Sequence, residues 1–264
     1  MAPPPLSGPP PGEVHVWLSF LADVPTPLEA AYERLLDAGE RLRHQRYKVE
    51  GARREFLVGR ALVRTVLSRY APTAPADWRF EANEYGRPAI VGAASGLVFN
   101  LTHPRGLAAL AVARDCDLGI DVESVDRPSA SHDLAGRYFS TPEAEFVRAG
   151  GSLLAERFFA VWTLKEAYIK ARGMGLALPL DGFSYDLAVA SPTIAFADTC
   201  PDDPARWRFW RGGVSDMHRL ALAVSPQTAG ARVDFRRIVP LTGFDEALTP
   251  AVICLDAPAD RRKA

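Results

Sequence analysis

The longest helical pattern in the chain contains the stretch Trp162–Lys170, WTLKEAYIK, and this stretch does most to decide the fold. The pattern begins near Ser152 and ends at about Arg172, because Gly173 follows it as a helix stop. Its aromatic residues are expected to pack into the core. That packing would hold Glu166 on a rigid element, as a precise site requires.

A second informative stretch, Gly119–Glu123 (GIDVE), is typical of a strand over 118–123. Side chains two positions apart in a strand share a face, so Asp121 and Glu123 would project together while their apolar neighbours enter the core. Two carboxylates on one face repel each other, and a cation, a basic residue or a proton must neutralise them. Such oxygen ligands suit Mg²⁺. The alternative is an edge strand with its acidic face in water.

Glu166 and Lys170 are four residues apart and would share one helix face. They form either a surface ion pair of little energetic weight or part of a site. In a site, Glu166 would be a third carboxylate facing Asp121 and Glu123, and Lys170 would meet an anion one turn further on.

Thr102 and His103 end another predicted strand, just before a turn. There a hydroxyl and an imidazole could meet a phosphate, or His103 could simply satisfy a structural hydrogen bond. The sequence contains neither GxxxxGK[ST] nor GxGxxG, so the two common nucleotide-binding motifs are not supported. Gly150–Ser152 is expected to be a loop and helix cap rather than an anion site.

Composition limits the class of protein. The 264 residues allow one large domain or two smaller ones. With 31 basic and 32 acidic residues, the chain lacks the basic excess of a nucleic-acid-binding protein. It has no apolar run long enough to span a membrane and no secretory signal pattern at its start. Three scattered cysteines argue against a disulfide scaffold or a thiolate zinc site, so we expect a cytoplasmic protein.

The remaining pattern predicts alternating helices and strands. Residues 1–12 are a proline-rich lead-in expected to be disordered, and 251–264 form a polar tail. A helix should follow Pro27 and stop at Gly39. The other expected helices cover 50–70, 131–139 and 142–149, and the other expected strands cover 14–20, 78–81, 97–103, 106–114, 183–189, 206–211, 218–224 and 233–240.

A faint internal echo suggests two similar halves. Residues 106–115 (GLAALAVARD) resemble 218–227 (HRLALAVSPQ), and each follows a long helix. We therefore expect an α/β fold with an N-terminal half over 13–118 and a C-terminal half over 119–250, although strands of this composition also resemble each other by chance.

Four motifs occur together in a fixed order: NEYGRP, FNLTH, GIDVE and WTLKEAYIKARGMGLALPL. This combination resembles the 4'-phosphopantetheinyl transferases, specifically the long single-chain type that activates nonribosomal peptide and polyketide synthases. The likeness is close over residues 83–180 and looser over the arginine-rich helix 52–69. It implies two similar α/β halves related by pseudo-two-fold symmetry, with the active site in the cleft between them.

The resemblance also implies a reaction. Such enzymes move the phosphopantetheine arm of coenzyme A to a serine of an apo acyl or peptidyl carrier protein, as in holo-[acyl-carrier-protein] synthesis, and release adenosine 3',5'-bisphosphate. By the family pattern, Asp121, Glu123 and Glu166 resemble the ligands of Mg²⁺, or of Mn²⁺ in its place. Glu166 is also the candidate base for the carrier serine. Lys170 would neutralise phosphate oxygens.

On the coenzyme side, Arg87, Thr102 and His103 match positions that hold the nucleotide and its phosphates. The family often has lysine and serine where this chain has Arg87 and Thr102, and both changes keep the charge or the hydroxyl. Lys165 is also carried over, although it points about 100° away from Glu166 on an ideal helix. Arg54 is the candidate for the 3'-phosphate. Further basic candidates are Arg53, Arg43, Arg46 and Lys48.

The partner implied by the resemblance is an acidic, helical carrier protein, docked on His132–Val147. Arg137, Tyr138 and Phe139 are its candidate contacts, unless Tyr138 and Phe139 pack a short helix into the core. We expect a monomer that binds neither nucleic acid nor membrane. Two alternatives remain: a catalytically silent carrier-binding or coenzyme-A-binding module, and a metal-dependent phosphohydrolase that uses water as the nucleophile.

Overall fold

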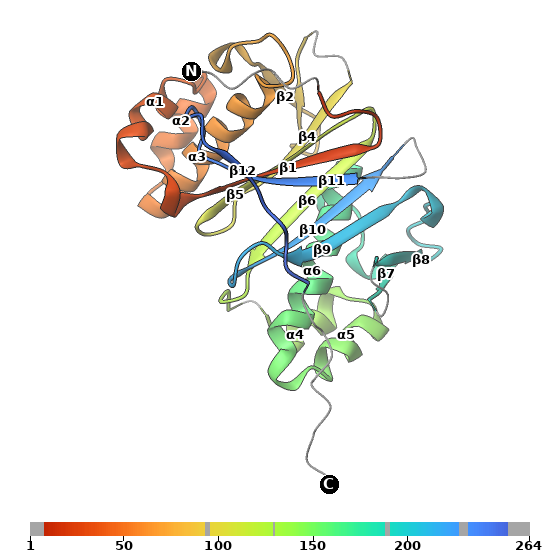
Figure 1. Cartoon of the computed structure of the whole chain (residues 1–264). Coiled ribbons are helices and arrows are strands. Elements are labelled where there is room, and N and C mark those ends of the chain that lie inside the picture. The colour runs from red at the N-terminus through yellow and green to blue at the C-terminus, as the bar shows by residue number, and fades with distance from the viewer. Residues whose placement is uncertain (1–7, 93–95, 129, 188–190, 227–231, 253–264) are drawn as a thin grey trace.

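The computed structural model describes residues 8–92, 96–128, 130–187, 191–226 and 232–252. Two sheets lie at the centre of the molecule (Figure 1). The larger sheet has the strand order β12 (Asp245–Ala247), β11 (Arg232–Ile238), β1 (Glu13–Phe20), β5 (Leu107–Arg114) and β4 (Leu97–Thr102). The smaller sheet has the order β6 (Asp117–Ser124), β10 (His218–Ser225) and β9 (Arg208–Gly213).

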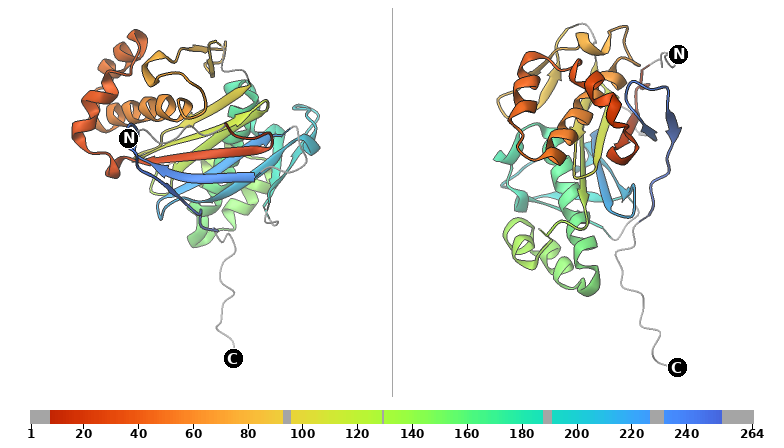
Figure 2. Two further views of the ribbon diagram at one scale, coloured as in Figure 1. Left: turned by 45° about the horizontal axis from the view of Figure 1, so that its top comes forward. Right: turned by 90° about the vertical axis from the view of Figure 1, so that its left-hand side faces the viewer.

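One long helix packs on each sheet. Helix α3 (Glu50–Leu67) contacts β5 of the larger sheet, and α6 (Leu154–Arg172) contacts β6 and β10 of the smaller one. Figure 2 shows α1 and α2 beside α3 at one end of the molecule and α4 and α5 at the other. The other elements are α1 (Glu29–Glu33), α2 (Ala38–Arg46), α4 (His132–Tyr138), α5 (Thr141–Arg148), and the hairpins of β2 (Phe80–Ala82) with β3 (Pro88–Ile90) and β7 (Phe183–Asp186) with β8 (Thr193–Phe196).

The alternation of side chains along the strands explains these layers. In β5, Leu107 and Ala109 join a core shared by both sheets, whereas Ala108 and Leu110 pack on the side of α3. Both faces are therefore buried, which is why β5 is a continuous apolar run. In β6, Ile120 enters the core shared by the sheets, as predicted. The other face of β6 is left for α6.

Most predicted elements are confirmed. The hairpin of β4 and β5, strand β6, and helices α3 to α6 lie within a few residues of their predicted bounds. The prediction of a helix stop at Gly39 is wrong. Asp37 accepts a hydrogen bond from the backbone N–H of Glu40 while the Glu40 side chain accepts from the N–H of Asp37, and this capping box starts α2 just before Gly39.

The chain does not divide between the sheets at residue 118. Strand β11 pairs in parallel with β1, for example Val16 with Phe235, so residues 232–247 return to the N-terminal sheet. The two strands that carry the internal echo, β5 and β10, each lie between two antiparallel neighbours. The two sheets nevertheless differ in size, and pseudo-two-fold symmetry stays a prediction.

The predictions for the chain ends fall mainly outside the described residues, which exclude 1–7 and 253–264. Residues 8–12 form neither helix nor strand. Within the described ranges, no helix combines the length and the apolar character that crossing a membrane would need.

Candidate active site

A glycine lets β6 lie directly against α6. A Cβ atom placed on Gly119 would be 2.0 Å from the carbonyl oxygen of Ala167 and 2.5 Å from the amide nitrogen of Ala171. Both are backbone atoms, which cannot rotate away. Because residues two apart in a strand share a face, Asp121 lies on the same side of β6 as Gly119 and therefore meets α6.

Six of the residues singled out from the sequence line one pocket of about 430 Å³. The pocket forms where β4 ends beside β6 and α6, and Leu101, Pro104, Val122, Arg127 and Trp162 complete its lining. The six residues are Thr102, His103, Asp121, Glu123, Glu166 and Lys170. Sequence reasoning placed these residues on three separate elements, and the fold brings them together.

Two basic side chains pair with the acids of β6. Lys170 Nζ donates to Asp121 Oδ1 at 2.5 Å, and Arg127 Nη1 donates to Glu123 Oε1 at 2.5 Å. Thr102 Oγ1 also donates to Asp121 Oδ1, at 3.4 Å. These contacts partly offset the repulsion between the carboxylates of Asp121 and Glu123, which the strand pattern predicted.

These ion pairs do not fully neutralise the carboxylates of the pocket, and the deficit is largest at Glu166. Burial, and then the neighbouring charge of Asp121, raise the pKa of Glu166 to about 7. The same two causes raise the pKa of Glu123. Both shifts mean that the ionised carboxylates lack stabilisation, and an added cation would supply it.

The acids also fit a hard metal ion. Asp121 is almost fully buried, and its Oδ2 atom finds no hydrogen-bond partner among the described residues. Carboxylate oxygens are the donors that Mg²⁺ prefers. No three His, Cys, Asp or Glu side chains of the described residues stand close enough together to form a ready-made metal site. Lys170 and Arg127 occupy oxygens of Asp121 and Glu123 here, so metal binding would have to compete with both ion pairs.

His103 lies on the basic side of the pocket. Burial lowers the pKa of the His103 imidazole, and the charges of Arg60, Lys170 and Arg43 lower it further. Gly59 of α3 lies beside this residue, since a Cβ there would be in ordinary contact with His103 Cδ2, at 3.8 Å. Around His103 the protein therefore concentrates positive charge suited to an anionic ligand.

Sequence reasoning missed Arg60 as a site residue. Its guanidinium and that of Arg43 each lie 5.3 Å from the ring centroid of Phe56. The Nε atom of Arg60 is buried without a hydrogen-bond partner among the described residues, and its Nη1 lies 3.7 Å from Glu40 Oε1.

Two arginines predicted to bind coenzyme A have other partners. Arg54 donates to Glu29 Oε1 and to the carbonyl oxygen of Val24, both at 2.7 Å. Arg87 donates to the carbonyl oxygens of Ala171 and Leu118. Neither arginine lines the pocket. The structure therefore does not bring them to the six-residue cluster.

The expectation that Lys165 binds the coenzyme is corrected by its surroundings. Its side chain is fully buried, and its Nζ lies 2.8 Å from Glu143 Oε2. It also donates to the carbonyl oxygens of Leu180 and Phe183, at 2.7 and 2.6 Å. All of its donors are thus used inside the C-terminal half, on the side of α6 away from Glu166. Lys165 is a structural residue that joins α5, α6 and β7.

The candidate carrier contacts divide into residues that pack into the core and residues that are exposed. Phe139 is buried against Phe158 and Trp162, so its role is packing. Tyr138 is half-buried against Trp162, and Arg137 is exposed over the Tyr138 ring. Of the three candidate contacts, Arg137 is therefore the most exposed to a partner.

Comparison with known proteins identifies the family. The family model of the 4'-phosphopantetheinyl transferase superfamily matches residues 117–225, which include β6 and α6. The chain is 37% identical over 169 residues to the 4'-phosphopantetheinyl transferase HetI of Nostoc, covering 62% of this chain and 70% of HetI. The chain belongs to the 4'-phosphopantetheinyl transferase superfamily.

Other relatives extend this likeness along the chain. A phosphopantetheinyl transferase of Thraustochytrium is 28% identical over 258 residues, covering 90% of this chain and 88% of that protein. The 4'-phosphopantetheinyl transferase Sfp of Bacillus subtilis is 36% identical over 142 residues, covering 53% of this chain and 61% of Sfp. This transferase is therefore of the long single-chain type, as its motifs suggested.

Proposed function

We propose that this transferase moves the 4'-phosphopantetheine arm of coenzyme A to a serine of an apo carrier protein, with Mg²⁺ as cofactor. The observation that carries the proposal is the single pocket that joins Asp121, Glu123 and Glu166 to Lys170 and His103. The proposal is supported by the chemistry of this lining, because carboxylates suit a metal ion and a lysine and an imidazole suit phosphate oxygens.

Different residues of the site would bind different parts of coenzyme A. Arg43 and Arg60 would supply positive charge for the phosphate of the nucleotide end, and His103, kept neutral by its lowered pKa, would offer it a hydrogen bond. Lys170 would neutralise a pyrophosphate oxygen once it leaves Asp121. Asp121, Glu123 and Glu166 would hold Mg²⁺, which when bound stabilises charge on the leaving phosphate. The remaining step, removal of the proton from the carrier serine, would be carried out by a side chain of this protein.

Glu166 is suited to act as the base. A serine hydroxyl is a weak nucleophile, so its proton must be removed as it attacks. The serine oxygen bonds to the phosphorus attached to the pantetheine, the bond from that phosphorus to the nucleotide breaks, and adenosine 3',5'-bisphosphate leaves. The serine proton goes to Glu166, directly or through water. Burial and the charge of Asp121 raise the pKa of Glu166 in the metal-free protein, which makes this carboxylate the readiest of the three acids to take up a proton.

The carriers that we propose are those of nonribosomal peptide, polyketide and fatty acid synthesis, served by a cytoplasmic monomer. Arg137 on α4 and Arg127 at the pocket edge offer positive charge to an acidic carrier. Charge complementarity of this kind mainly raises the association rate and selects partners.

The test is the release of adenosine 3',5'-bisphosphate from coenzyme A and Mg²⁺, measured with and without apo carrier. Release that requires the carrier supports the transferase. Release without it would indicate the phosphohydrolase, and no release with carriers of all three pathways would indicate the silent module. Glu166→Gln should stop the reaction while the protein still unfolds cooperatively.

A further inference from the structure

The side chain of His218 lies at the rim of the core that the two sheets share. His218 begins β10, and side chains two apart in a strand share a face. It therefore stands in one row with Leu220, Leu222 and Val224, which fill that core. Its ring packs edge-on against Phe20 of β1, with the ring centroids 6.4 Å apart. A buried imidazole in this position requires hydrogen-bond partners.

Both ring nitrogens of His218 have such partners. Nε2 lies 2.9 Å from the backbone carbonyl oxygen of Arg105, and because a carbonyl can only accept, Nε2 carries the proton and donates. Nδ1 lies 2.8 Å from Ser215 Oγ, which accepts from the backbone N–H groups of Met217 and His218, both at 3.2 Å. In the neutral ring Nδ1 then accepts from the Ser215 hydroxyl. The loop before β10 thus holds the imidazole in the tautomer and orientation that serve Arg105.

The carbonyl group that His218 holds belongs to the turn after His103. This turn, Pro104–Gly106, joins β4 to β5 in the larger sheet, whereas His218 lies in the smaller sheet. The hydrogen bond from His218 to Arg105 therefore crosses from one sheet to the other.

The same turn is also held from the side of the larger sheet. The N–H of Gly106 donates to Glu55 Oε1 of α3 at 3.2 Å, and the Gly106 carbonyl accepts from the N–H of Leu21, which follows β1, at 3.0 Å. His218 is thus a second anchor for the turn, placed on the other sheet.

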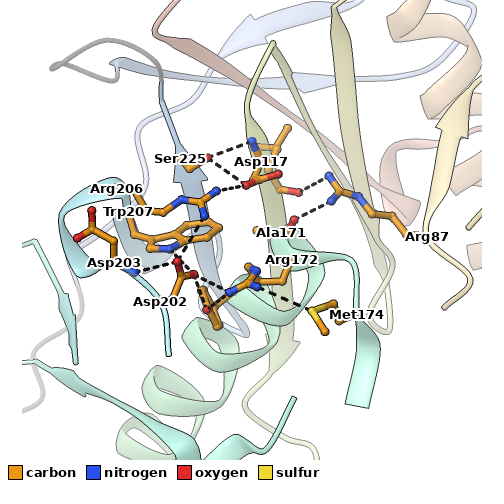
Figure 3. Close-up of polar contacts among 12 residues, drawn as sticks. Arg87, Asp117, Ala171, Arg172, Met174, Asp202, Asp203, Arg206, Trp207 and Ser225 are labelled. Carbon is orange, nitrogen blue, oxygen red and sulfur yellow. Dashed lines mark hydrogen bonds and ion pairs between the residues drawn. The ribbon is translucent and has the colours of Figure 1, made fainter. Parts of the chain in front are cut away.

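The opposite end of β10 has contacts of a different kind. Ser225 Oγ and Arg206 Nη2 both donate to Asp117 Oδ2, at 3.3 and 2.6 Å (Figure 3). These residues belong to β10, to the turn before β9 and to β6, so their contacts join the strands of the smaller sheet to one another. The contact of His218 instead joins the smaller sheet to the larger one.

The hydrogen bond of His218 helps to set where His103 stands relative to the acids. Strand β10 pairs with β6, with His218 opposite Ser124 and the next pair holding Glu123. A link from β10 to the turn therefore fixes the turn against the strand that carries Asp121 and Glu123. Without that link, the turn would lose its anchor on the smaller sheet, and His103 could shift relative to the acids.

We propose that His218 is a positioning residue for the binding of coenzyme A, an inference that rests on the proposed function. It lies outside the lining of the pocket and acts through the Arg105 carbonyl, which places the turn and therefore His103.

The test measures kcat and KM for coenzyme A, and also the Kd for coenzyme A by calorimetric titration with Mg²⁺ and no carrier. His218→Leu should raise KM and Kd about threefold to tenfold, the weight of one net hydrogen bond, and change kcat less than about twofold. His218→Gln should recover most of the affinity, because a side-chain amide can donate to the same carbonyl. The matched control is His15→Leu, which removes a half-buried histidine bonded to Tyr70 outside the pocket lining and should keep the wild-type Kd.

A double substitution gives a readout that a merely structural role would not move. If His218 acts through the position of His103, adding His218→Leu to His103→Ala should change the Kd by less than about twofold. Additive losses of affinity would overturn the proposal, and so would an unchanged Kd in His218→Leu.

Ser215→Ala tests the same contact at an exposed position if His218→Leu does not unfold cooperatively. It should raise the Kd about twofold in the wild type and leave it unchanged in His103→Ala, because the imidazole loses the group that orients it. An unchanged Kd in both backgrounds would overturn the proposal. If the wild type binds coenzyme A but modifies no carrier, the proposed function fails, and the Kd values still decide the role of His218. If it binds no coenzyme A, both proposals fail.

Discussion

Replacing Gly119 with alanine should separate the two elements that carry the site. The added Cβ would lie 2.0 Å from the Ala167 oxygen, whereas Cβ atoms essentially never come within 3.0 Å of such a neighbour. The strand and the helix must therefore move apart by about 1 Å, since both sides of the contact are backbone. A misplacement of that size can cost a factor of about 100 in rate. The overpacking should also lower the free energy of unfolding by about 1–3 kcal/mol.

The assay is the rate of carrier modification together with thermal unfolding of the same sample. Gly51→Ala is the matched control, because Gly51 lies in α3 with nothing within 4 Å of its added Cβ. That control should keep full activity and lose no stability, because its added Cβ meets nothing in the first turn of α3. Full activity and unchanged stability of Gly119→Ala would refute the claim that close contact of β6 and α6 sets the site.

Three further outcomes are expected. His103→Ala should raise the KM for coenzyme A more than it lowers kcat, because His103 lies on the basic side of the pocket; an unchanged KM in steady-state kinetics would remove it from the substrate site. Lys165→Met should lower the free energy of unfolding by about 3–5 kcal/mol, the usual cost of leaving a buried charge such as Glu143 without its partner; urea unfolding that matches the wild type would restore Lys165 as a candidate coenzyme ligand. The raised pKa of Glu166 means that the folded protein holds this proton more tightly than the unfolded chain, so its stabilising contribution is lost as pH rises from about 4.5 to about 7. Calorimetry of the metal-free protein should show this loss, Mg²⁺ should reduce it, and Glu166→Gln should diminish it to the part contributed by the raised pKa of Glu123; a loss of undiminished size in Glu166→Gln would belong to another group.

The sequence predicts the site better than it predicts the architecture. The alternation in GIDVE correctly assigned the faces of β6, because successive side chains of a strand point to opposite faces. The spacing of Glu166 and Lys170 correctly assigned a shared helix face, since helical geometry is local. Both patterns act over a few residues, and neither requires knowledge of the rest of the fold.

The return of β11 to pair with β1 was not predictable in this way. The partners, such as Val16 and Phe235, are more than 200 residues apart in the chain, and periodicity within a strand does not say which strand lies beside it. The same limit explains why the contacts of Arg54 and Arg87 were not predicted from the sequence. Whether Arg54 or Arg87 meets a carboxylate, a carbonyl or a ligand depends on elements brought together only by the fold.

The role of Lys165 could not be predicted from the sequence for a different reason. A lysine beside Glu166 in a motif helix is most simply expected to share its function. Two of its neighbours in space, Glu143 and the carbonyl of Phe183, lie outside the motif, and the third, the carbonyl of Leu180, belongs to its last residue, beyond the end of the helix. Burial of an ammonium group becomes favourable only with such partners, and those partners are visible only in the structure.

The measurement that tests the central claim most directly is the intact mass of an apo carrier protein after incubation with this transferase and coenzyme A. The account predicts a gain of one phosphopantetheine arm when Mg²⁺ is present, and no gain with a chelator, with Asp121→Ala, or with a carrier whose acceptor serine is alanine. A gain of equal size and rate for Asp121→Ala, or in the absence of any divalent metal, would contradict the assignment of this pocket as the transfer site.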